Sequence, residues 1–194
     1  MTTTFPVVLA SRSPRRLLLL SQIGLTVRVV VSDVPEDLDP ARTPEANAEA
    51  LACLKAQHVA RGIPEGIVIG ADTIVVLDHH VLGKPVDEAD AARMLRLLSG
   101  RTHTVFTGFA LVRQPGGHLI SGVEATQVTF RDLPDEEIQA YIRGGSPMDK
   151  AGAYGIQDDY GAVFVTRIEG CYYNVVGLPL ARVHQAMKQV RSER

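Results

Sequence analysis

Residues 7–20 have the sequence VVLASRSPRRLLLL, which passes from an apolar run through a short polar turn into a run of leucines. Val7–Ala10 is typical of a short buried strand, and the leucines are typical of a helix. Ser13 suits the N-cap position, Pro14 suits the first helical position, and Gly24 is a natural stop. The stretch therefore predicts a strand, a tight polar turn and a helix.

Helices and hairpins are expected along the rest of the chain. The expected helices cover residues 44–62, 88–98, 134–143 and 178–190. The expected strands cover residues 25–31, 67–69 and 74–77, and hairpins are expected over 103–131 and 162–176. The glycine-rich residues 144–161 predict a long functional loop. Strand–helix units mixed with hairpins predict a mixed sheet in an α/β or α+β architecture.

The composition excludes several classes of protein. The 194 residues carry a formal net charge of -2 and a pI near 6.3, so no nucleic-acid partner is expected. Cys53 and Cys171 lack metal-ligand spacing and fit buried thiols in a reducing compartment. The start of the chain lacks a signal-peptide pattern, and the apolar runs are too short to span a bilayer. We expect a soluble cytoplasmic protein with no membrane partner.

Two arginines at the start of the first predicted helix are unusual. A helix N-terminus carries partial positive charge, so Arg15 and Arg16 each cost a few tenths to roughly 1 kcal/mol unless an anion lies nearby. Free backbone N–H groups, the hydroxyls of Ser11 and Ser13 and the two guanidinium groups would together form a phosphate cradle. The alternative is that both arginines are solvated beside a serine cap.

Three lysines are candidates for further phosphate contacts. Lys55 falls on the apolar stripe of the second predicted helix, because Leu51, Lys55 and Val59 are spaced i, i+4, i+8. A lysine there either binds an anion or extends its ammonium group to solvent. Lys84, in a stiff Gly-Lys-Pro loop, and Lys150 are either phosphate ligands or surface lysines.

Two carboxylates are candidates for catalysis or metal binding. Asp72 lies between two apolar strand segments, where a carboxylate is costly to bury without a partner or a metal. It is either a ligand at a strand end or a hydrogen-bonded turn residue. Glu36 belongs to an acidic loop, most of whose residues are expected to be solvated. The motifs of P-loop, dinucleotide-binding, serine hydrolase and zincin sites are absent from the sequence.

Six short motifs occur in order along nearly the whole chain. They are LASRSPRR at 9–16, GADT at 70–73, GKP at 83–85, LSG at 98–100, DKAGAYGIQ at 149–157 and VGLPL at 176–180. Each motif alone is weak, but their combination is specific. It closely resembles the Maf family of nucleotide pyrophosphatases, in the branch that prefers dTTP and UTP.

The resemblance implies a fold and an activity. The fold is a single domain over residues 1–194, a two-lobed α/β structure like that of inosine triphosphate pyrophosphatases, with a mixed sheet and a central cleft. The activity is hydrolysis of a nucleoside triphosphate to the monophosphate and pyrophosphate by a homodimer that requires a divalent metal cation, Mg²⁺, Mn²⁺ or Co²⁺. The rival interpretation, from the family's association with septum formation, is a nucleotide-binding regulator of cell division without turnover.

The resemblance also implies the site residues. Phosphate and substrate contacts are implied for Ser11, Arg15, Arg16, Lys55 and Lys84. Glu36 and Asp72 are implied as the carboxylates of the metal and water site, with Asp72 the catalytic group as a general base or a metal ligand. Base preference is implied for Arg16, Thr73 and Gln157.

The side chains of Gln157 and Thr73 suit the recognition of a pyrimidine base. Gln157 and Thr73 offer an amide and a hydroxyl that match the O4 and N3–H edge shared by uracil and thymine.

Arg12 departs from the family pattern, which often has a small residue between the two serines. It either adds a phosphate contact or points outward.

Overall fold

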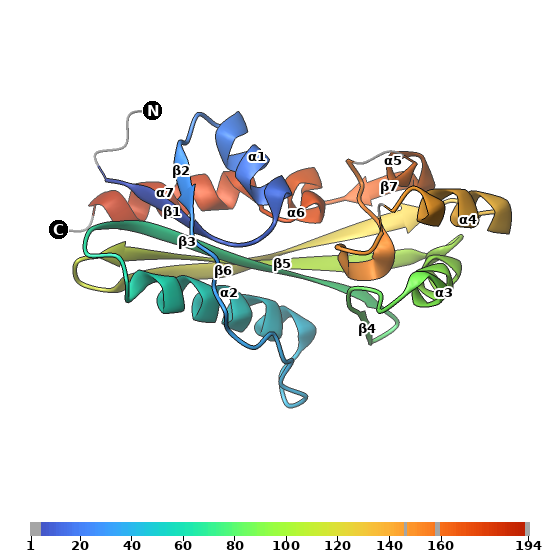
Figure 1. Ribbon diagram of the computed structural model, residues 1–194, viewed down its shortest axis with the longest axis horizontal. Helices are drawn as coiled ribbons and strands as arrows, with labels where there is room; N and C mark the ends of the chain where they lie inside the picture. The colour runs from blue at the N-terminus through green and yellow to red at the C-terminus, as the bar shows by residue number, and fades with distance from the viewer. Residues whose placement is uncertain (1–4, 146, 158–159, 193–194) are drawn as a thin grey trace. The chain divides into compact units, whose positions relative to one another are not determined.

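The computed structural model describes residues 5–145, 147–157 and 160–192 (Figure 1). Its helices are α1 (Pro14–Gln22), α2 (Pro44–Ala60), α3 (Glu88–Leu98), α4 (Asp135–Arg143), the 3-10 helix η1 (Ala151–Ala153), α5 (Gly161–Phe164), α6 (Tyr172–Val176) and α7 (Leu180–Ser192). Its strands are β1 (Val7–Ala10), β2 (Val27–Val29), β3 (Gly66–Leu77), β4 (His80–Leu82), β5 (Thr102–Gln114), β6 (His118–Phe130) and β7 (Val165–Glu169).

The strands form a sheet of mixed direction. Their order is β2–β1–β3–β5–β6–β7, and β4 pairs with β3. β1 is parallel to both β2 and β3, with Val7 opposite Val27 on one side and Ile67 on the other. β4 is antiparallel to β3, and β7 is antiparallel to β6. The predicted mixed sheet is confirmed, and its parallel strands joined through helices belong to the α/β class.

The chain divides into two compact units. The first unit contains Met1–Asp72, Thr107–Glu124 and Gly177–Arg194, and the second contains Thr73–Phe106 and Ala125–Val176. β3, β5 and β6 each contribute residues to both units. The division agrees with the two lobes that the family resemblance implies.

In the first unit, α2 packs against the sheet through small residues. Thr43 caps this helix by accepting a hydrogen bond from the Ala46 N–H. A side chain on Gly70 of β3 would overlap the carbonyl oxygen of Ala52, so glycine lets the helix backbone approach the strand closely. α1 and α7 lie on the other side of this part of the sheet (Figure 1). The buried cluster under α2 consists of Val8, Ala10, Ala52, Ala56, Val59, Ala60, Ile63, Val68, Ala110 and Val112.

The second unit has an aromatic core. The ring centroids of Phe130 and Tyr154 lie 4.7 Å apart with the rings nearly perpendicular, and His103 packs edge-on against both. Phe164 contacts Phe130 and Tyr141 in the same cluster. Aromatic pairs of this kind contribute about 0.5–1.5 kcal/mol each beyond the burial of their surface.

β3 is longer than the sequence predicted. Residues 67–69 and 74–77 are parts of one continuous strand, so Asp72 lies inside a strand and not in a turn or at a strand end. An ion pair with Lys55 supplies the partner that a carboxylate needs in this half-buried position.

Two smaller differences from the prediction concern β2 and α1. β2 is shorter than expected. Ser13 occupies the N-cap position of α1, but its side chain makes no capping hydrogen bond.

The predicted hairpin over residues 162–176 is wrong. Val165–Glu169 is a strand, but its antiparallel partner is β6, and Tyr172–Val176 is helical. The Asn174 amide in that helix is buried and donates to the Val105 carbonyl and the Thr126 hydroxyl. These contacts favour a helical turn over an extended strand. The other predicted helices and the hairpin over 103–131 are confirmed to within a few residues.

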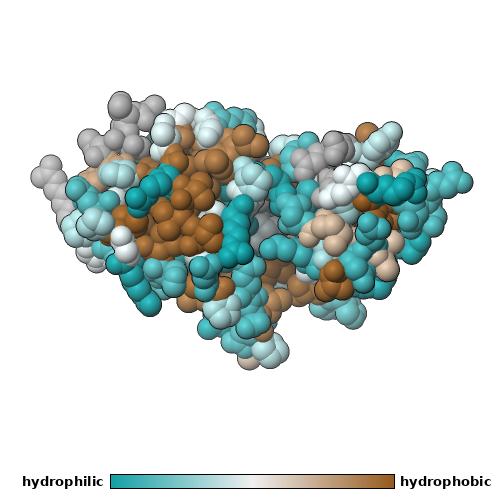
Figure 2. Space-filling view, in the orientation of Figure 1, coloured by the Kyte–Doolittle hydropathy of each residue, from teal (hydrophilic) through white to brown (hydrophobic). Residues whose placement is uncertain are grey.

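Apolar side chains gather on one face of the first unit, over α1 and β2 (Figure 2). Leu18, Val29 and Val31 are among the exposed apolar residues. Large apolar patches on a surface often mark sites of contact with other molecules. Within residues 5–145, 147–157 and 160–192, no helix has both the length and the apolar composition needed to cross a membrane.

Candidate active site

The turn between β1 and α1 holds a buried arginine. The Arg16 Nε–H donates to the Gly177 carbonyl oxygen over 2.8 Å, and its Nη1 donates to the Ser11 hydroxyl over 3.1 Å. Ser11 Oγ also accepts from the Ser13 N–H, and both Ser11 and Arg16 are buried. Arg16 is therefore fixed in the structure, which excludes the alternative of a solvated arginine for this residue.

The other two arginines of this turn differ from Arg16. Arg15 is half-buried. Arg12 is exposed and forms an ion pair with Asp33, 2.7 Å between Nη2 and Oδ1. Both side chains of that pair are more than three-quarters exposed, so it contributes little to stability. Arg12 points outward in this structure.

Lys55 joins two carboxylates. Its Nζ lies 2.6 Å from Asp72 Oδ1 and 2.7 Å from Glu36 Oε1. The Lys55 side chain is 6% exposed and that of Asp72 13%, whereas that of Glu36 is 50% exposed. We call these three residues the Lys55 cluster. Lys55 is buried and paired, so the alternative of a lysine that extends to solvent is wrong.

The packing of α2 on β3 explains why the Lys55 cluster forms. Residues i and i+2 of a strand share a face, so Asp72 is on the same face as Gly70. The missing side chain at Gly70 brings α2 close to that face, between Ala52 and Ala56. Lys55 lies between these two alanines in the sequence of the helix, and its ammonium group reaches Asp72 on the strand. Gly70 thus allows the close approach of α2, and that approach lets Asp72 pair with Lys55.

Asn47 holds the loop that carries Glu36. Its Oδ1 accepts from the Asp39 N–H over 2.9 Å, and its Nδ2 donates to the carbonyl oxygens of Asp39 and Arg42. Asn47 is buried in the first turns of α2. The sequence interpretation missed this residue; a buried asparagine beside an acidic loop was the available signal.

The charges of the first unit favour an anion at this site. Burial lowers the pKa of the Arg16 guanidinium, the negative charges of Asp72 and Glu36 raise it, and the positive charge of Arg15 lowers it. Asp72, Glu36 and Arg15 therefore lie close enough to Arg16 for their charges to act on it. Three cations, Arg15, Arg16 and Lys55, stand against two carboxylates, so the local balance is positive.

The two carboxylates also fit a divalent cation of the magnesium type. Within the described ranges, no group of three or more His, Cys, Asp or Glu side chains is arranged to hold a metal ion. Mg²⁺ commonly binds through one or two carboxylates and completes its coordination with water and substrate phosphates. Asp72 and the half-exposed Glu36 can supply those carboxylates.

The remaining predicted residues belong to the second unit. Thr73 follows Asp72 in β3 and is half-buried, and Lys84 is exposed in the loop after β4. Lys150 is buried and pairs with Asp149 over 2.8 Å. Gln157 is half-buried, and its Nε2 is buried with no hydrogen-bond partner in the part of the chain that the structure describes. Their assignment to the same site as the Lys55 cluster stays a prediction.

Comparisons with known proteins agree with the motifs. The family model for Maf, described as Maf-like protein, matches residues 6–190. A dTTP/UTP pyrophosphatase of Chlorobium phaeovibrioides is 46% identical over 191 residues, covering 96% of this chain and 98% of that protein. Proteins of the same name from Moorella thermoacetica and Koribacter versatilis are 51% and 52% identical over 181 and 183 residues, covering 93% and 94% of this chain and 93% of each relative.

A solved structure of a HAM1 protein from Coxiella burnetii is a more distant match. It aligns with a TM-score of 0.45 and 16% identity, covering 68% of this chain and 75% of that chain. This similarity carries no conclusion about function.

Proposed function

We propose that this chain, which belongs to the Maf family, hydrolyses dTTP and UTP to the nucleoside monophosphate and pyrophosphate, a house-cleaning reaction of nucleotide metabolism. The observation that carries the proposal is the Lys55 cluster, in which a buried ammonium group holds two carboxylates beside the buried Arg16. Relatives that are about half identical over nearly the whole chain are named for this activity.

Cations of the first unit bind the triphosphate. Arg15 and Lys55 supply positive charge, and the Ser11 hydroxyl supplies a hydrogen-bonding group beside Arg16. Positioning and charge neutralisation provide most of the catalysis in phosphoryl transfer. Lys84, in the second unit, is the remaining phosphate ligand of the proposal.

Asp72 orients the attacking water. Lys55 fixes Oδ1 of this carboxylate, which limits the directions in which Oδ2 can accept a hydrogen bond from water. The water oxygen attacks the α-phosphorus while one of its protons passes to the Asp72 carboxylate or to solvent, the bond from that phosphorus to the bridging oxygen breaks, and pyrophosphate leaves. A divalent cation held by Asp72 and Glu36 would supply further positive charge to the phosphate oxygens.

Gln157, Thr73 and Arg16 select the base. The buried Gln157 Nε2, which lacks a partner among the described residues, supports a role in which a ligand oxygen such as O4 accepts its hydrogen bond. The amide oxygen would accept from N3–H of the same base edge. Cytosine reverses this donor and acceptor pattern, and a site built for one pattern rejects the other strongly.

Gln157→Glu tests the base selection. We expect turnover of dTTP and UTP to fall by roughly 10–100-fold, because the carboxylate cannot donate to O4. Initial rates of pyrophosphate release with dTTP, UTP and CTP measure the change. The same fractional loss with all three nucleotides would contradict base selection by Gln157.

The wider proposal concerns the whole protein. It is a single Maf-like domain over residues 1–194, acts in the cytoplasm, requires Mg²⁺, Mn²⁺ or Co²⁺, and forms a homodimer. The apolar patch over α1 and β2 is consistent with a contact between copies (Figure 2).

A substrate panel tests the proposed reaction. The protein is incubated with dTTP, UTP, CTP, dATP and GTP in the presence of each of the three metal ions, and released pyrophosphate is measured. We expect dTTP and UTP to be hydrolysed at least about a hundredfold faster than CTP. Binding of dTTP without release of pyrophosphate under any metal ion would favour a regulator without turnover and contradict the proposal.

A further inference from the structure

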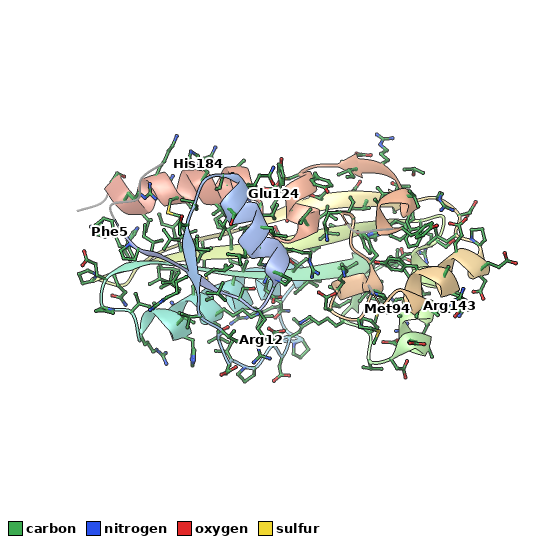
Figure 3. All side chains as sticks on the ribbon, turned by 45° about the horizontal axis from the view of Figure 1, so that its top comes forward. Phe5, Arg12, Met94, Glu124, Arg143 and His184 are labelled. Atoms are coloured by element: carbon green, nitrogen blue, oxygen red, sulfur yellow. The ribbon has the colours of Figure 1, made fainter. Side chains whose placement is uncertain are left out.

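The first unit contains a cavity of about 250 Å³ that the proposed reaction does not use. It lies between α7 and the segment that follows α1, and its lining residues are Ile23, Leu25, Val183, His184, Met187, Lys188 and Arg191. His184, Met187, Lys188 and Arg191 are spaced i, i+3, i+4, i+7, so α7 presents one continuous stripe to the cavity. Figure 3 labels His184 on this helix.

Arg191 has hydrogen-bonding groups without an acceptor. Its Nε and Nη2 are both buried, and neither has a hydrogen-bond partner among residues 5–145, 147–157 and 160–192. These two nitrogens form the edge of the guanidinium group that binds a carboxylate through two parallel hydrogen bonds. Nearly all buried polar groups in proteins are paired, so this edge calls for a hydrogen-bond acceptor, which a carboxylate supplies with two oxygens.

The remaining lining residues indicate what kind of anion fits. Ile23, Leu25, Val183 and Met187 are apolar, and the polar members are Lys188, Arg191 and His184. None of the seven lining residues is acidic. The cavity therefore suits a molecule with an apolar body and a negatively charged end.

The cavity is separate from the candidate active site within the same unit. Arg15 and Arg16 are in the first turn of α1, whereas Ile23 caps the other end of that helix. At 1.5 Å per residue, Arg15 and Ile23 are about 12 Å apart along the helix axis. None of the residues proposed to bind the triphosphate lines the cavity.

We propose that this cavity binds a small organic carboxylate with a compact apolar body. The carboxylate pairs with the Nε and Nη2 edge of Arg191 after a small movement of that side chain, Lys188 adds positive charge, and the apolar body contacts Leu25, Val183 and Met187. A closed apolar cavity of about 150 Å³ holds a benzene ring. A ligand of the size of benzoate therefore fits the available volume.

Benzoate binding tests this proposal. Calorimetry and methyl NMR spectra of the full chain are recorded with benzoate, and with benzyl alcohol as the uncharged analogue. We expect saturable benzoate binding that shifts the methyl signals of Leu25, Val183 and Met187, and at least tenfold weaker binding of benzyl alcohol. Equal affinity for the two molecules, or no saturable binding of benzoate, would overturn the proposal.

Variants of α7 locate the binding group. Arg191→Gln should weaken benzoate binding at least tenfold, and Arg191→Lys should give an intermediate affinity because it keeps the charge but not the two-pronged edge. Arg182→Gln changes an arginine of the same helix that does not line the cavity and should bind benzoate like the wild type. Unchanged affinity in Arg191→Gln would overturn the proposal.

A second route covers the case in which Arg191→Gln does not fold. Ile23→Trp places a larger ring into the cavity from a half-buried position and should abolish benzoate binding. Hydrolysis of dTTP serves as an independent readout, because neither residue belongs to the proposed active site. A wild-type protein that binds benzoate but does not hydrolyse dTTP would contradict the proposed function and leave the proposed cavity ligand supported.

Discussion

The two units treat buried polar groups in opposite ways. In the first unit, Lys55 and Asp72 are buried or nearly so and form an ion pair, and the cluster opens to solvent through the half-exposed Glu36. In the second unit, His103 and Tyr154 share a hydrogen bond of 2.7 Å and are enclosed by aromatic rings. Burial lowers the pKa of His103 to about 4, so the pair is uncharged near neutral pH.

This difference in polar groups distinguishes the candidate active site in the first unit from the packed core of the second. Charged groups are costly to bury, and an ion-paired cluster next to solvent indicates binding or chemistry. A neutral polar pair among aromatic rings stabilises one arrangement of the core. Changes in the Lys55 cluster should therefore lower turnover, whereas changes in the His103–Tyr154 pair should alter stability and its dependence on pH.

Among the changes that leave Asp72 in place, the largest effect is expected for Lys55→Met. Methionine keeps the apolar stem but removes the ammonium group that holds Asp72 and Glu36. We expect kcat/KM for dTTP to fall roughly 10²–10³-fold, the usual effect of removing one preorganised donor from a site where charge develops. Steady-state pyrophosphate release measures this. Gln57→Met, at an exposed position of α2, is the control, and an equal loss there would show that the effect comes from the helix.

The next effect is expected when the neutral pair is replaced by His103→Phe with Tyr154→Phe. The unfolded state takes up a proton on His103 near its ordinary pKa of 6.5, whereas the folded state does so only near pH 4. Protonation therefore favours the unfolded state, and the stability is lost as the pH falls below about 6.5. Between pH 7.5 and 4.5 we expect the wild type to lose roughly 2–3 kcal/mol more than the double variant.

Urea unfolding at several pH values measures this difference. The double variant leaves no unpaired hydroxyl, so its stability at pH 7.5 should lie within about 1 kcal/mol of the wild type. Its rate of dTTP hydrolysis at that pH should be close to the wild-type rate. Parallel acid profiles for the two proteins would contradict a neutral buried His103.

The smallest effect is expected for Asn47→Ala, which changes a residue that holds the Glu36 loop but is not itself a proposed metal or substrate ligand. The change removes the hydrogen bonds from Asn47 to Asp39 and Arg42, so the loop that carries Glu36 is held less firmly. We expect about a tenfold rise in the Mg²⁺ concentration needed for half-maximal rate, because groups that orient metal ligands have effects of this size. A Mg²⁺ titration of dTTP hydrolysis measures it. Lower thermal stability with an unchanged Mg²⁺ profile would mean that Asn47 has no part in positioning Glu36.

The sequence predicted the members of the Lys55 cluster better than their arrangement. A lysine on an apolar helical stripe and a carboxylate in an apolar strand each break a local pattern, so both could be recognised. That they pair depends on the close approach of α2 to β3 at Gly70, which no local pattern expresses. Arg16 illustrates the same limit, because its acceptor at Gly177 is 161 residues away in the sequence.

The second unit contains features that local patterns could not predict. His103 and Tyr154 are 51 residues apart, and neither breaks the pattern of its own segment. Residues 172–176 are rich in tyrosine and valine, which favour strands. Their helical conformation depends on the buried hydrogen bonds of Asn174 to the strands β5 and β6, so tertiary contacts outweighed local preference.

Asp72→Asn tests most directly whether hydrolysis takes place at the Lys55 cluster. Asparagine preserves the size of the side chain and an oxygen for Lys55 but removes the negative charge. We predict a protein with a melting temperature close to that of the wild type that releases pyrophosphate from dTTP at least ~10³-fold more slowly. A folded Asp72→Asn variant that hydrolyses dTTP at the wild-type rate would contradict the assignment of the active site.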